Sequence, residues 1–334
     1  MMSSHPTAES RVLAIDAGNS KTDVLLVSSD GTVLGRARGG GFRPHVVGPD
    51  AAVAGLEPLL DRLVTAAGLT RRDGEPWVGQ VSACLANADL EVELERLQHQ
   101  IEQRRWGVTT YVGNDTFALL RAGNETPPAV AVVCGAGINC SGLLPDGRTA
   151  RFAALGKISG DWGGGAFLAE EALWWASRSV DGRGPVTSLA RDLPEHYGVA
   201  DMAALLESLH LGVIAEERVQ EVTPLLFRAA DRGDPVAVSL VQRQADEIVA
   251  LAVSAMHRLD LIDDPVDVVL GGGVLTAGHA LLLDAIDAGL AERAPKANAR
   301  VVDAPPVVGA ALLGLDRIGA SGAAQARLRS GVAT

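Results

Sequence analysis

Near its start the chain carries an apolar run that ends in a polar, glycine-containing turn. Residues 12–15 (Val-Leu-Ala-Ile) lead into the turn at 16–20 (Asp-Ala-Gly-Asn-Ser), and a second apolar run, 24–27, follows. The pair Asp30-Gly31, which favours tight hairpins, then separates this run from two further apolar residues at 33–34. We therefore predict a three-stranded β-meander.

The same pattern returns in the middle of the chain. Residues 130–133 run apolar into Cys-Gly-Ala-Gly-Ile-Asn at 134–139, and Leu143, Leu144 and the hairpin pair Asp146-Gly147 follow. Exposed backbone N–H groups at glycine turns bind anions, so two such turns could hold one polyphosphate. The repeat predicts a two-lobed, nucleotide-dependent phosphotransferase.

Around these meanders, apolar residues recur at helical spacing or in short buried runs. We predict helices over 51–67, 90–104, 117–122, 166–178, 202–208, 215–232, 235–259, about 277–291 and 305–319. Further strands are predicted at 78–85, 108–112 and 266–270, and loops at 39–45, 86–89 and 153–165. Interleaved strands and helices indicate an α/β fold with mixed sheets.

Composition narrows the class of protein. The 334 residues, 47% of them hydrophobic, can bury a large core and suggest two domains. The net charge of -12 argues against binding to nucleic acid. The polar start, residues 1–10, lacks the apolar segment of a signal peptide, and no apolar run is long enough to span a membrane. We expect a cytoplasmic protein.

Three cysteines, Cys84, Cys134 and Cys140, lack the spacing of a zinc or redox motif. Free cysteine packs as a small hydrophobic residue, and this is the favoured interpretation. An iron–sulfur role for Cys134 or Cys140 remains the alternative.

Polar side chains crowd the first turn. Ser20 and Thr22 could donate hydrogen bonds to phosphate oxygens, Lys21 adds positive charge, and Asp16 could hold Mg²⁺ through water. Gly18 by itself indicates only a turn. The alternative interpretation is an ordinary polar hairpin.

Asp115 is the candidate general base because it follows a predicted strand end, where open sheets bind ligands. Phosphoryl transfer to an alcohol needs a carboxylate that accepts the hydroxyl proton. Alternatively, residues 114–116 only cap the next helix. Asp161 lies in a loop with five glycines and is favoured as a ligand contact, whereas Trp162 could line a sugar site or pack internally.

Several of these segments carry a family resemblance. Residues 16–23 (Asp-Ala-Gly-Asn-Ser-Lys-Thr-Asp) resemble the first phosphate motif of actin-like sugar kinases. Residues 114–116 with 120–123 resemble the catalytic strand end of the N-acetylglucosamine kinase branch of the BadF/BadG/BcrA/BcrD ATPase family. Residues 135–140 are similar to its second phosphate motif, 271–273 to its adenosine motif, and 229–234 to a helix turn near the adenine.

The resemblance implies two ribonuclease-H-like lobes with a nucleotide cleft between them. We place the first lobe at 11–117 with about 316–334, and the second at 118–315. The resemblance also implies ATP and Mg²⁺ as cofactors, a sugar as substrate and a homodimer. By this resemblance Asp115 is catalytic and Asp16 holds the metal. The ATP-binding residues are Gly18, Asn19, Ser20, Lys21, Thr22, Ala136, Gly137, Gly271, Gly272 and Gly273. The substrate-binding residues are Arg43, His45, Asn87, Asp89, Asn139 and Asp161.

Three segments depart from the family pattern, and all three concern the sugar. The sugar loop reads Phe-Arg-Pro-His at 42–45 where an Asn is usual, so Arg43 could pair with an anionic substrate group or face solvent. The usual Gly-Ala-Asp loop reads Asn-Ala-Asp at 87–89, and Trp162 replaces a Glu. Substrate identity is therefore the least determined part of the prediction.

We predict ATP-dependent phosphorylation of an amino sugar, N-acetylglucosamine to its 6-phosphate. Glucosamine, a muramic-type sugar or an anhydro-sugar are alternative substrates. A second hypothesis is an ATPase that activates a partner redox enzyme, which would need a cysteine-held cluster. A sugar-sensing regulator is disfavoured because no DNA-binding module precedes Val12.

Overall fold

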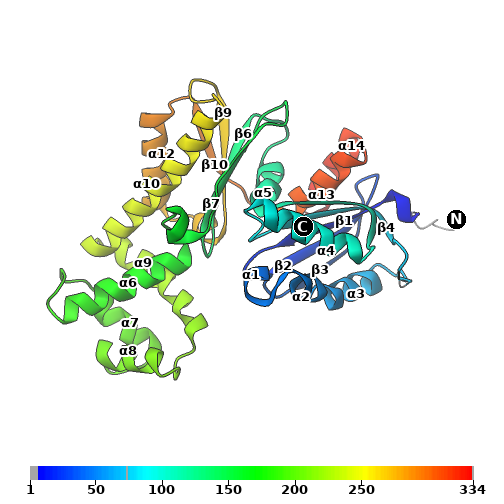
Figure 1. The fold of residues 1–334 in the computed structure, drawn as a ribbon. Helices are drawn as coiled ribbons and strands as arrows, with labels where there is room; N and C mark the ends of the chain where they lie inside the picture. The colour runs from blue at the N-terminus through cyan, green and yellow to red at the C-terminus, as the bar shows by residue number, and fades with distance from the viewer. Residues whose placement is uncertain (1–6, 73, 333–334) are drawn as a thin grey trace. The chain divides into compact units, whose positions relative to one another are not determined.

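The computed structural model describes residues 7–72 and 74–332 (Figure 1). By its contacts the chain forms two compact units. The first contains the residues up to Ala131, Ser141–Ala153 and the stretch from Val302 onward, and the second contains Val132–Cys140 and Ala154–Val301. Residues 118–131, 141–153 and 302–315, which the sequence assigned to the second lobe, thus make their contacts in the first unit. The lobe bounds themselves stay a prediction.

The first unit is built on a five-stranded sheet in the order β3-β2-β1-β4-β5. Its strands are β1 (Arg11–Ala17), β2 (Thr22–Ser28), β3 (Val33–Gly39), β4 (Val78–Leu85) and β5 (Gly107–Asn114). The strands β1, β2 and β3 form the predicted antiparallel meander, while β4 and β5 run parallel to β1. Ala17 is aligned with Leu85, and Leu85 with Asn114. The carboxyl ends of the three parallel strands therefore lie at one edge.

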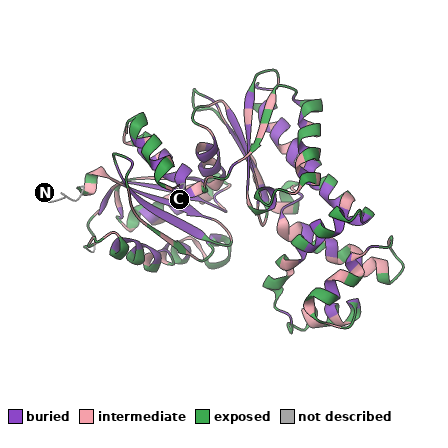
Figure 2. Ribbon diagram, turned by 180° about the vertical axis from the view of Figure 1, so that it is seen from behind, coloured by how far each residue is buried: buried purple, intermediate pink, exposed green. Residues whose placement is uncertain are grey.

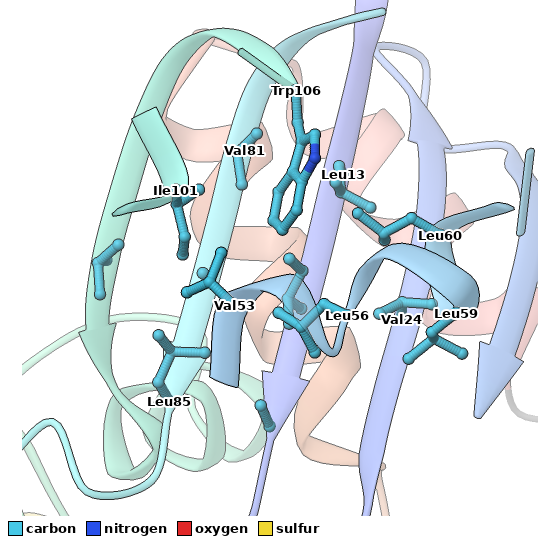
Figure 3. Close-up of a cluster of buried hydrophobic side chains, with 14 of the residues drawn as sticks. Leu13, Val24, Val53, Leu56, Leu59, Leu60, Val81, Leu85, Ile101 and Trp106 are labelled. Atoms are coloured by element: carbon cyan, nitrogen blue, oxygen red, sulfur yellow. The ribbon is translucent and has the colours of Figure 1, made fainter. Parts of the chain in front are cut away.

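Alternate residues of this sheet face two separate cores, as period-two side-chain alternation requires. Leu13 and Ile15 face the cluster under α2 (Pro49–Ala54), α3 (Glu57–Ala66) and α4 (Glu91–Gln103) (Figure 3). Val12 and Ala14 pack instead with residues of α5 (Asp115–Gly123) and α13 (Pro306–Arg317). The strands β1, β2 and β4 are buried on both faces over nearly their whole length (Figure 2).

Two helix predictions were wrong in detail. Residues 51–67 form two helices, not one, because the chain turns at Gly55. Pro58 lies in the first turn of α3, where a helix does not need the N–H that proline lacks. Residues 215–232 likewise divide into η3 (Glu216–Glu221) and α9 (Val222–Asp231). The predicted loop 39–45 ends in a short helix, α1 (Pro44–Val47), which Pro44 opens.

The second sheet is also mixed and has the order β10-β9-β6-β7-β8. Its strands are β6 (Ala129–Cys134), β7 (Ile138–Leu143), β8 (Thr149–Arg151), β9 (Val266–Gly271) and β10 (Ala297–Val301). The sequence did not predict β10, because the alternation over 297–301 is short and rests on two alanines, which are depleted in strands. Its parallel pairing with β9 defines it as a strand.

Helices flank this sheet and form a helical region beyond it. The long α10 (Pro235–Arg258) packs on α12 (Ala280–Arg293), and a Cβ on Gly289 would lie 2.9 Å from Val249 Cγ2. The remaining elements are η1 (Ala8–Ser10), η2 (Gly156–Ser159), α6 (Gly165–Val180), α7 (Leu189–Tyr197), α8 (Met202–His210), α11 (Gly273–Thr276) and α14 (Gly322–Val332). The helix α7 was not among the helices predicted from the sequence. Among residues 7–72 and 74–332, none of the helices combines the length and apolar character needed to cross a bilayer.

Candidate active site

Three segments predicted to act together meet at the carboxyl edge of the first sheet. The hairpin turn at 18–21 follows β1, the loop at 86–89 follows β4, and Asp115 follows β5. Because β1, β4 and β5 are neighbouring parallel strands, their ends deliver these segments side by side. Ligands of open α/β sheets bind at such carboxyl ends.

The turn after β1 is closed by its own backbone and by the loop after β3. Gly18 N donates to Lys21 O at 2.8 Å, and Phe42 N donates to Gly18 O at 2.9 Å. A Cβ on Gly41 would lie 2.1 Å from Asn19 O, so only glycine allows this approach. The predicted sugar loop and the predicted phosphate turn therefore pack directly against each other.

Two predicted phosphate contacts differ in their surroundings. Ser20 is exposed, whereas Thr22 is buried and its hydroxyl donates to Gly40 O at 2.9 Å. Thr22 therefore holds the loop after β3, a role that the sequence did not predict and that competes with phosphate binding. Lys21 is exposed, with Nζ 3.9 Å from Asp23 Oδ2.

Asn19 connects two of the predicted substrate residues. Asn87 Nδ2 donates to Asn19 Oδ1 at 2.9 Å and to Phe42 O at 3.3 Å, while Arg43 Nε donates to Asn19 O at 3.0 Å. Asn87 has a φ of 59°, a left-handed conformation that Asn tolerates better than most residues. His45 is exposed on α1.

Asp89 is fixed from two sides. Asn114 Nδ2 donates to Asp89 Oδ1 at 2.8 Å, and Arg151 of β8 donates to the carbonyl oxygens of Ala88 and Asp89 at 3.1 and 2.9 Å. Arg151 was not predicted as a site residue, because its partners lie more than sixty residues earlier in the chain. Its guanidinium ties the loop at 86–89 to a strand of the second sheet.

Asp115 begins α5 and is half-buried. The helix cap is provided by Asn114, whose Oδ1 accepts from Thr116 N at 3.1 Å and Thr116 Oγ1 at 2.6 Å. Burial raises the pKa of Asp115 to about 6, against the opposing effect of the backbone amides of Thr116 and Asp115. A carboxylate with this pKa can accept a proton near neutral pH.

Asp16 lies at the end of β1 and is buried. Burial, followed by the negative charges of Asp115 and Asp23, raises its pKa to about 8. The nearby cations pair with Asp23 instead, Arg38 Nε lying 2.5 Å from Asp23 Oδ1. A buried carboxylate beside other acids suits a divalent cation, because the cation would offset these charges. The residues present therefore fit Mg²⁺ held by Asp16.

In the second unit, three glycine segments pack against one another. A Cβ on Gly164 would lie 2.5 Å from Gly137 Cα, and one on Gly272 would lie 2.5 Å from Cys134 O. Both glycines have left-handed φ values, 88° and 91°. The turn at 135–137 is joined to the start of α6 by Gly165 N, which donates to Gly135 O at 2.7 Å. The predicted second phosphate motif and adenosine motif are therefore in direct contact, and Gly164 is the residue that the prediction missed.

The other predicted substrate residues of this unit are Asn139 and Asp161. Asn139 lies on β7 and accepts from Cys140 N at 2.7 Å. Asp161 accepts from Ser159 Oγ at 2.5 Å within its glycine-rich loop. Trp162 packs internally, because only 7% of it is exposed and Arg243 lies 4.2 Å from its ring.

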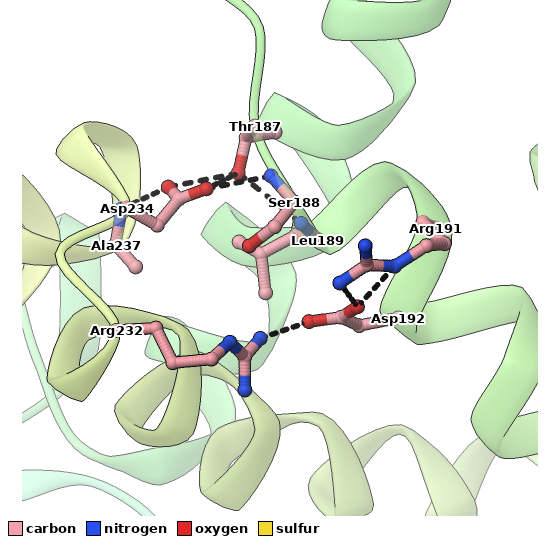
Figure 4. Close-up of polar contacts among 8 residues, drawn as sticks. All are labelled: Thr187, Ser188, Leu189, Arg191, Asp192, Arg232, Asp234 and Ala237. Atoms are coloured by element: carbon pink, nitrogen blue, oxygen red, sulfur yellow. Dashed lines mark hydrogen bonds and ion pairs between the residues drawn. The ribbon is translucent and has the colours of Figure 1, made fainter.

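The helix turn that the resemblance places near the adenine contains Asp234. Both oxygens of its carboxylate accept hydrogen bonds from other residues of the protein (Figure 4). It accepts from Thr187 Oγ1 at 2.9 Å, from Ser188 N at 2.6 Å and from two amides at the start of α10. Burial alone would raise its pKa, but these donors outweigh burial and lower it. Asp234 therefore fixes the 187–188 segment to α10.

Cys134 and Cys140 are buried, with 0% and 1% exposure, and burial raises the pKa of both thiols. Within the described part of the chain, no group of three or more His, Cys, Asp or Glu side chains could hold a metal ion by itself. The buried-thiol interpretation of these two cysteines is thus supported.

The profile of the BadF/BadG/BcrA/BcrD ATPase family matches residues 13–314. The chain belongs to this family. A crystal structure of a proposed N-acetylglucosamine kinase from Chromobacterium violaceum has the same fold, with a TM-score of 0.70 and 24% identity over 92% of this chain and 99% of that one. The predicted family and the predicted class of two mixed, helix-flanked sheets are confirmed.

Two curated relatives are sugar kinases. The chain is 25% identical to the N-acetyl-D-glucosamine kinase of Dictyostelium discoideum over 313 residues, which is 91% of this chain and 97% of that protein. It is 24% identical to the N-acetylmuramic acid/N-acetylglucosamine kinase of Clostridium acetobutylicum over 266 residues, 79% of this chain and 85% of that protein.

Proposed function

We propose that this chain transfers the γ-phosphoryl group of ATP to the 6-hydroxyl of an amino sugar, N-acetylglucosamine in the first instance, with Asp115 as general base. The predicted enzyme class, an ATP-dependent sugar kinase, follows from membership of the ATPase family and from two kinase relatives that align over most of the chain.

One observation carries the proposal. Asp115 places a carboxylate with a raised pKa at the strand edge that also bears the turn at 18–21 and the loop at 86–89. It would accept the hydroxyl proton while Asn87 and Asp89, held by their contacts with Asn19 and Asn114, orient the sugar.

In the first unit, backbone N–H groups of the turn at 18–21 would bind phosphate oxygens of ATP. In the second unit, the glycine segments 135–137, Gly164 and 271–273 are the proposed nucleotide-binding segments. Asp16 would hold Mg²⁺ through water. When bound, the ion neutralises charge on the phosphoryl oxygens. A homodimer also remains a prediction, which sedimentation can test.

The activator hypothesis is not favoured, because the buried Cys134 and Cys140 offer no exposed thiols for a shared cluster. The substrate is tested by measuring ADP release with hexoses, hexosamines, their N-acetyl forms, muramic-type sugars and anhydro-sugars. Absence of ADP release with every amino sugar would contradict the proposal.

The Asp115→Asn variant tests the catalytic assignment. We expect ATP binding to persist in calorimetry while kcat falls by roughly a hundredfold to ten-thousandfold, because the amide cannot accept the proton. Asp146→Asn, in the exposed hairpin turn of the second meander, is the matched control and should keep its activity. A near-normal kcat for Asp115→Asn would refute the assignment.

A further inference from the structure

A hollow of about 610 Å³ opens in the first unit between the turn after β1 and the helices α1, α2 and α3. We name it the arginine hollow. Asn19, Ser20 and the glycine-rich segment 39–43 line one side, and apolar residues of the three helices line the other. The proposed reaction uses the turn at 18–21 at the rim of this space and assigns no role to the rest of it.

The charge of the arginine hollow has one sign. Of the described residues that line it, Arg43 and Arg62 are charged and none carries a carboxylate. Arg43 Nε donates to Asn19 O, and Arg62 donates to the carbonyl oxygens of Pro58 and Arg38 at 3.4 and 3.2 Å. Among the described residues neither arginine forms an ion pair, so both positive charges are available to a ligand.

The guanidinium group of Arg43 is held in place. The residues on either side, Phe42 and Pro44, are buried, and the bond from Nε to Asn19 O fixes the side chain on the hairpin turn. The terminal nitrogens of Arg43 remain for a bidentate contact, the geometry in which arginine best recognises a carboxylate.

The opposite wall is apolar and partly exposed. Val46 and Val47 are 67% and 57% exposed and lie beside Leu56 and Leu59 in the lining. A ligand that fits has a carboxylate on a short apolar group. A simple neutral hexosamine would leave both arginines and both valines without partners.

We propose that the arginine hollow binds a carboxylate carried by the substrate, so that among amino sugars one with a short acidic side chain is accepted in preference to neutral N-acetylglucosamine. This inference rests on the proposed function. The contact chain from Arg43 through Asn19 to Asn87 connects the arginine hollow to the strand edge that bears Asp115. One substrate could therefore present its hydroxyl to Asp115 and its carboxylate to Arg43.

The test compares N-acetylmuramic acid with its neutral carboxamide, which has nearly the same shape. ADP release and calorimetric binding are measured for both compounds. We expect the wild-type protein to prefer the acid by roughly tenfold or more, in kcat/KM and in affinity, because a charged hydrogen-bonded pair replaces a neutral contact. Equal values for acid and carboxamide would overturn the proposal.

Arg43→Gln should reduce the acid-to-carboxamide ratio to near one, in turnover and in binding. Arg72→Gln is the control, because Arg72 lies outside the arginine hollow and its guanidinium group lies 3.7 Å from Glu75. A preserved ratio in Arg43→Gln would overturn the assignment to Arg43, and unchanged thermal melting of this variant would exclude misfolding.

Two further results separate this inference from its alternatives. If no sugar is phosphorylated but the acid still binds better than the carboxamide and Arg43→Gln abolishes the difference, the proposed function fails and the arginine hollow stands. If lactate alone binds without competing with N-acetylmuramic acid, the arginine hollow is a separate effector site and the substrate proposal is wrong.

Discussion

At the scale of single residues, two carboxylates at one strand edge have different surroundings. Asp16 is buried beside Asp115 and Asp23, whereas Asp115 is half-buried at a helix start where Asn114 provides the cap. Their pKa values, about 8 and about 6, suit a residue that is neutralised by a cation and a residue that accepts a proton. Environment, more than residue type, would separate the two proposed roles.

The raised pKa of Asp115 predicts the pH dependence of turnover. A general base must be unprotonated, so kcat/KM should rise with pH and level off above the pKa of about 6. Below it the rate should fall about tenfold per pH unit. Initial rates in overlapping buffers measure this. A profile that stays flat to about pH 4.5 in the wild-type protein would contradict the role of Asp115.

At the scale of elements, the ends of helices and strands carry most of the specific contacts. The start of α6 is joined to the turn at 135–137, and the start of α10 is joined to the 187–188 segment. Each junction combines a backbone conformation with a hydrogen bond. Such junctions position the predicted nucleotide-binding segments of the second unit.

Gly164→Ala should disrupt the first of these junctions. The new Cβ would meet Gly137 at 2.5 Å, and the φ of 88° is strained for alanine. We expect a loss of about 2 kcal/mol or more in the free energy of unfolding, together with weaker ATP binding. Urea denaturation measures the first effect. Gly137→Ala is the stability control, since its Cβ would meet no atom within 4 Å; equal stabilities of the two variants would contradict the argument.

Asp234→Ala should disrupt the second junction, the one between the start of α10 and the 187–188 segment. It removes the cap of a 24-residue helix and leaves Thr187 and Ser188 without their acceptor. We expect the free energy of unfolding to fall by about 2–4 kcal/mol. Asp201→Ala is the matched control: Asp201 caps α8 through a single bond to Ala204 N, so its loss should cost only about 1 kcal/mol. Equal Tm shifts would indicate that the 187–188 contacts add nothing.

At the scale of the whole molecule, the raised pKa of Asp16 couples folding to pH. Between the ordinary value of 3.8 and about 8, the folded protein binds a proton that the unfolded chain has released. Stability therefore decreases as pH rises through this window. The raised pKa of Asp115 also makes stability decrease as pH rises, over the narrower window from 3.8 to about 6.

Thermal melting should accordingly give a lower Tm at about pH 8 than at about pH 5.5, and Asp16→Asn should reduce this difference. Because a bound cation offsets the charge of the ionised carboxylate, ATP with Mg²⁺ should raise the Tm more at the higher pH. A pH dependence that is identical in Asp16→Asn and the wild-type protein would exclude Asp16 as its source.

The sequence predicted the elements whose signals are local. Both meanders, the hairpin pairs Asp30-Gly31 and Asp146-Gly147, and the position of Asp115 after a strand follow from alternation and turn chemistry within about ten residues. It failed where local signals are weak, as in β10, or where one glycine or proline divides a helical pattern, as at Gly55.

Only the tertiary structure decided which distant residues share a site. Arg151 donates to Ala88 O, Gly164 packs on Gly137, Asn87 bonds to Asn19, and Arg43 donates to Asn19 O. Each of these contacts joins segments that are far apart along the chain or on different elements. Strand order and packing bring them together, and no periodicity along a single sequence encodes those distances, because they depend on all the burial and backbone pairing between the segments.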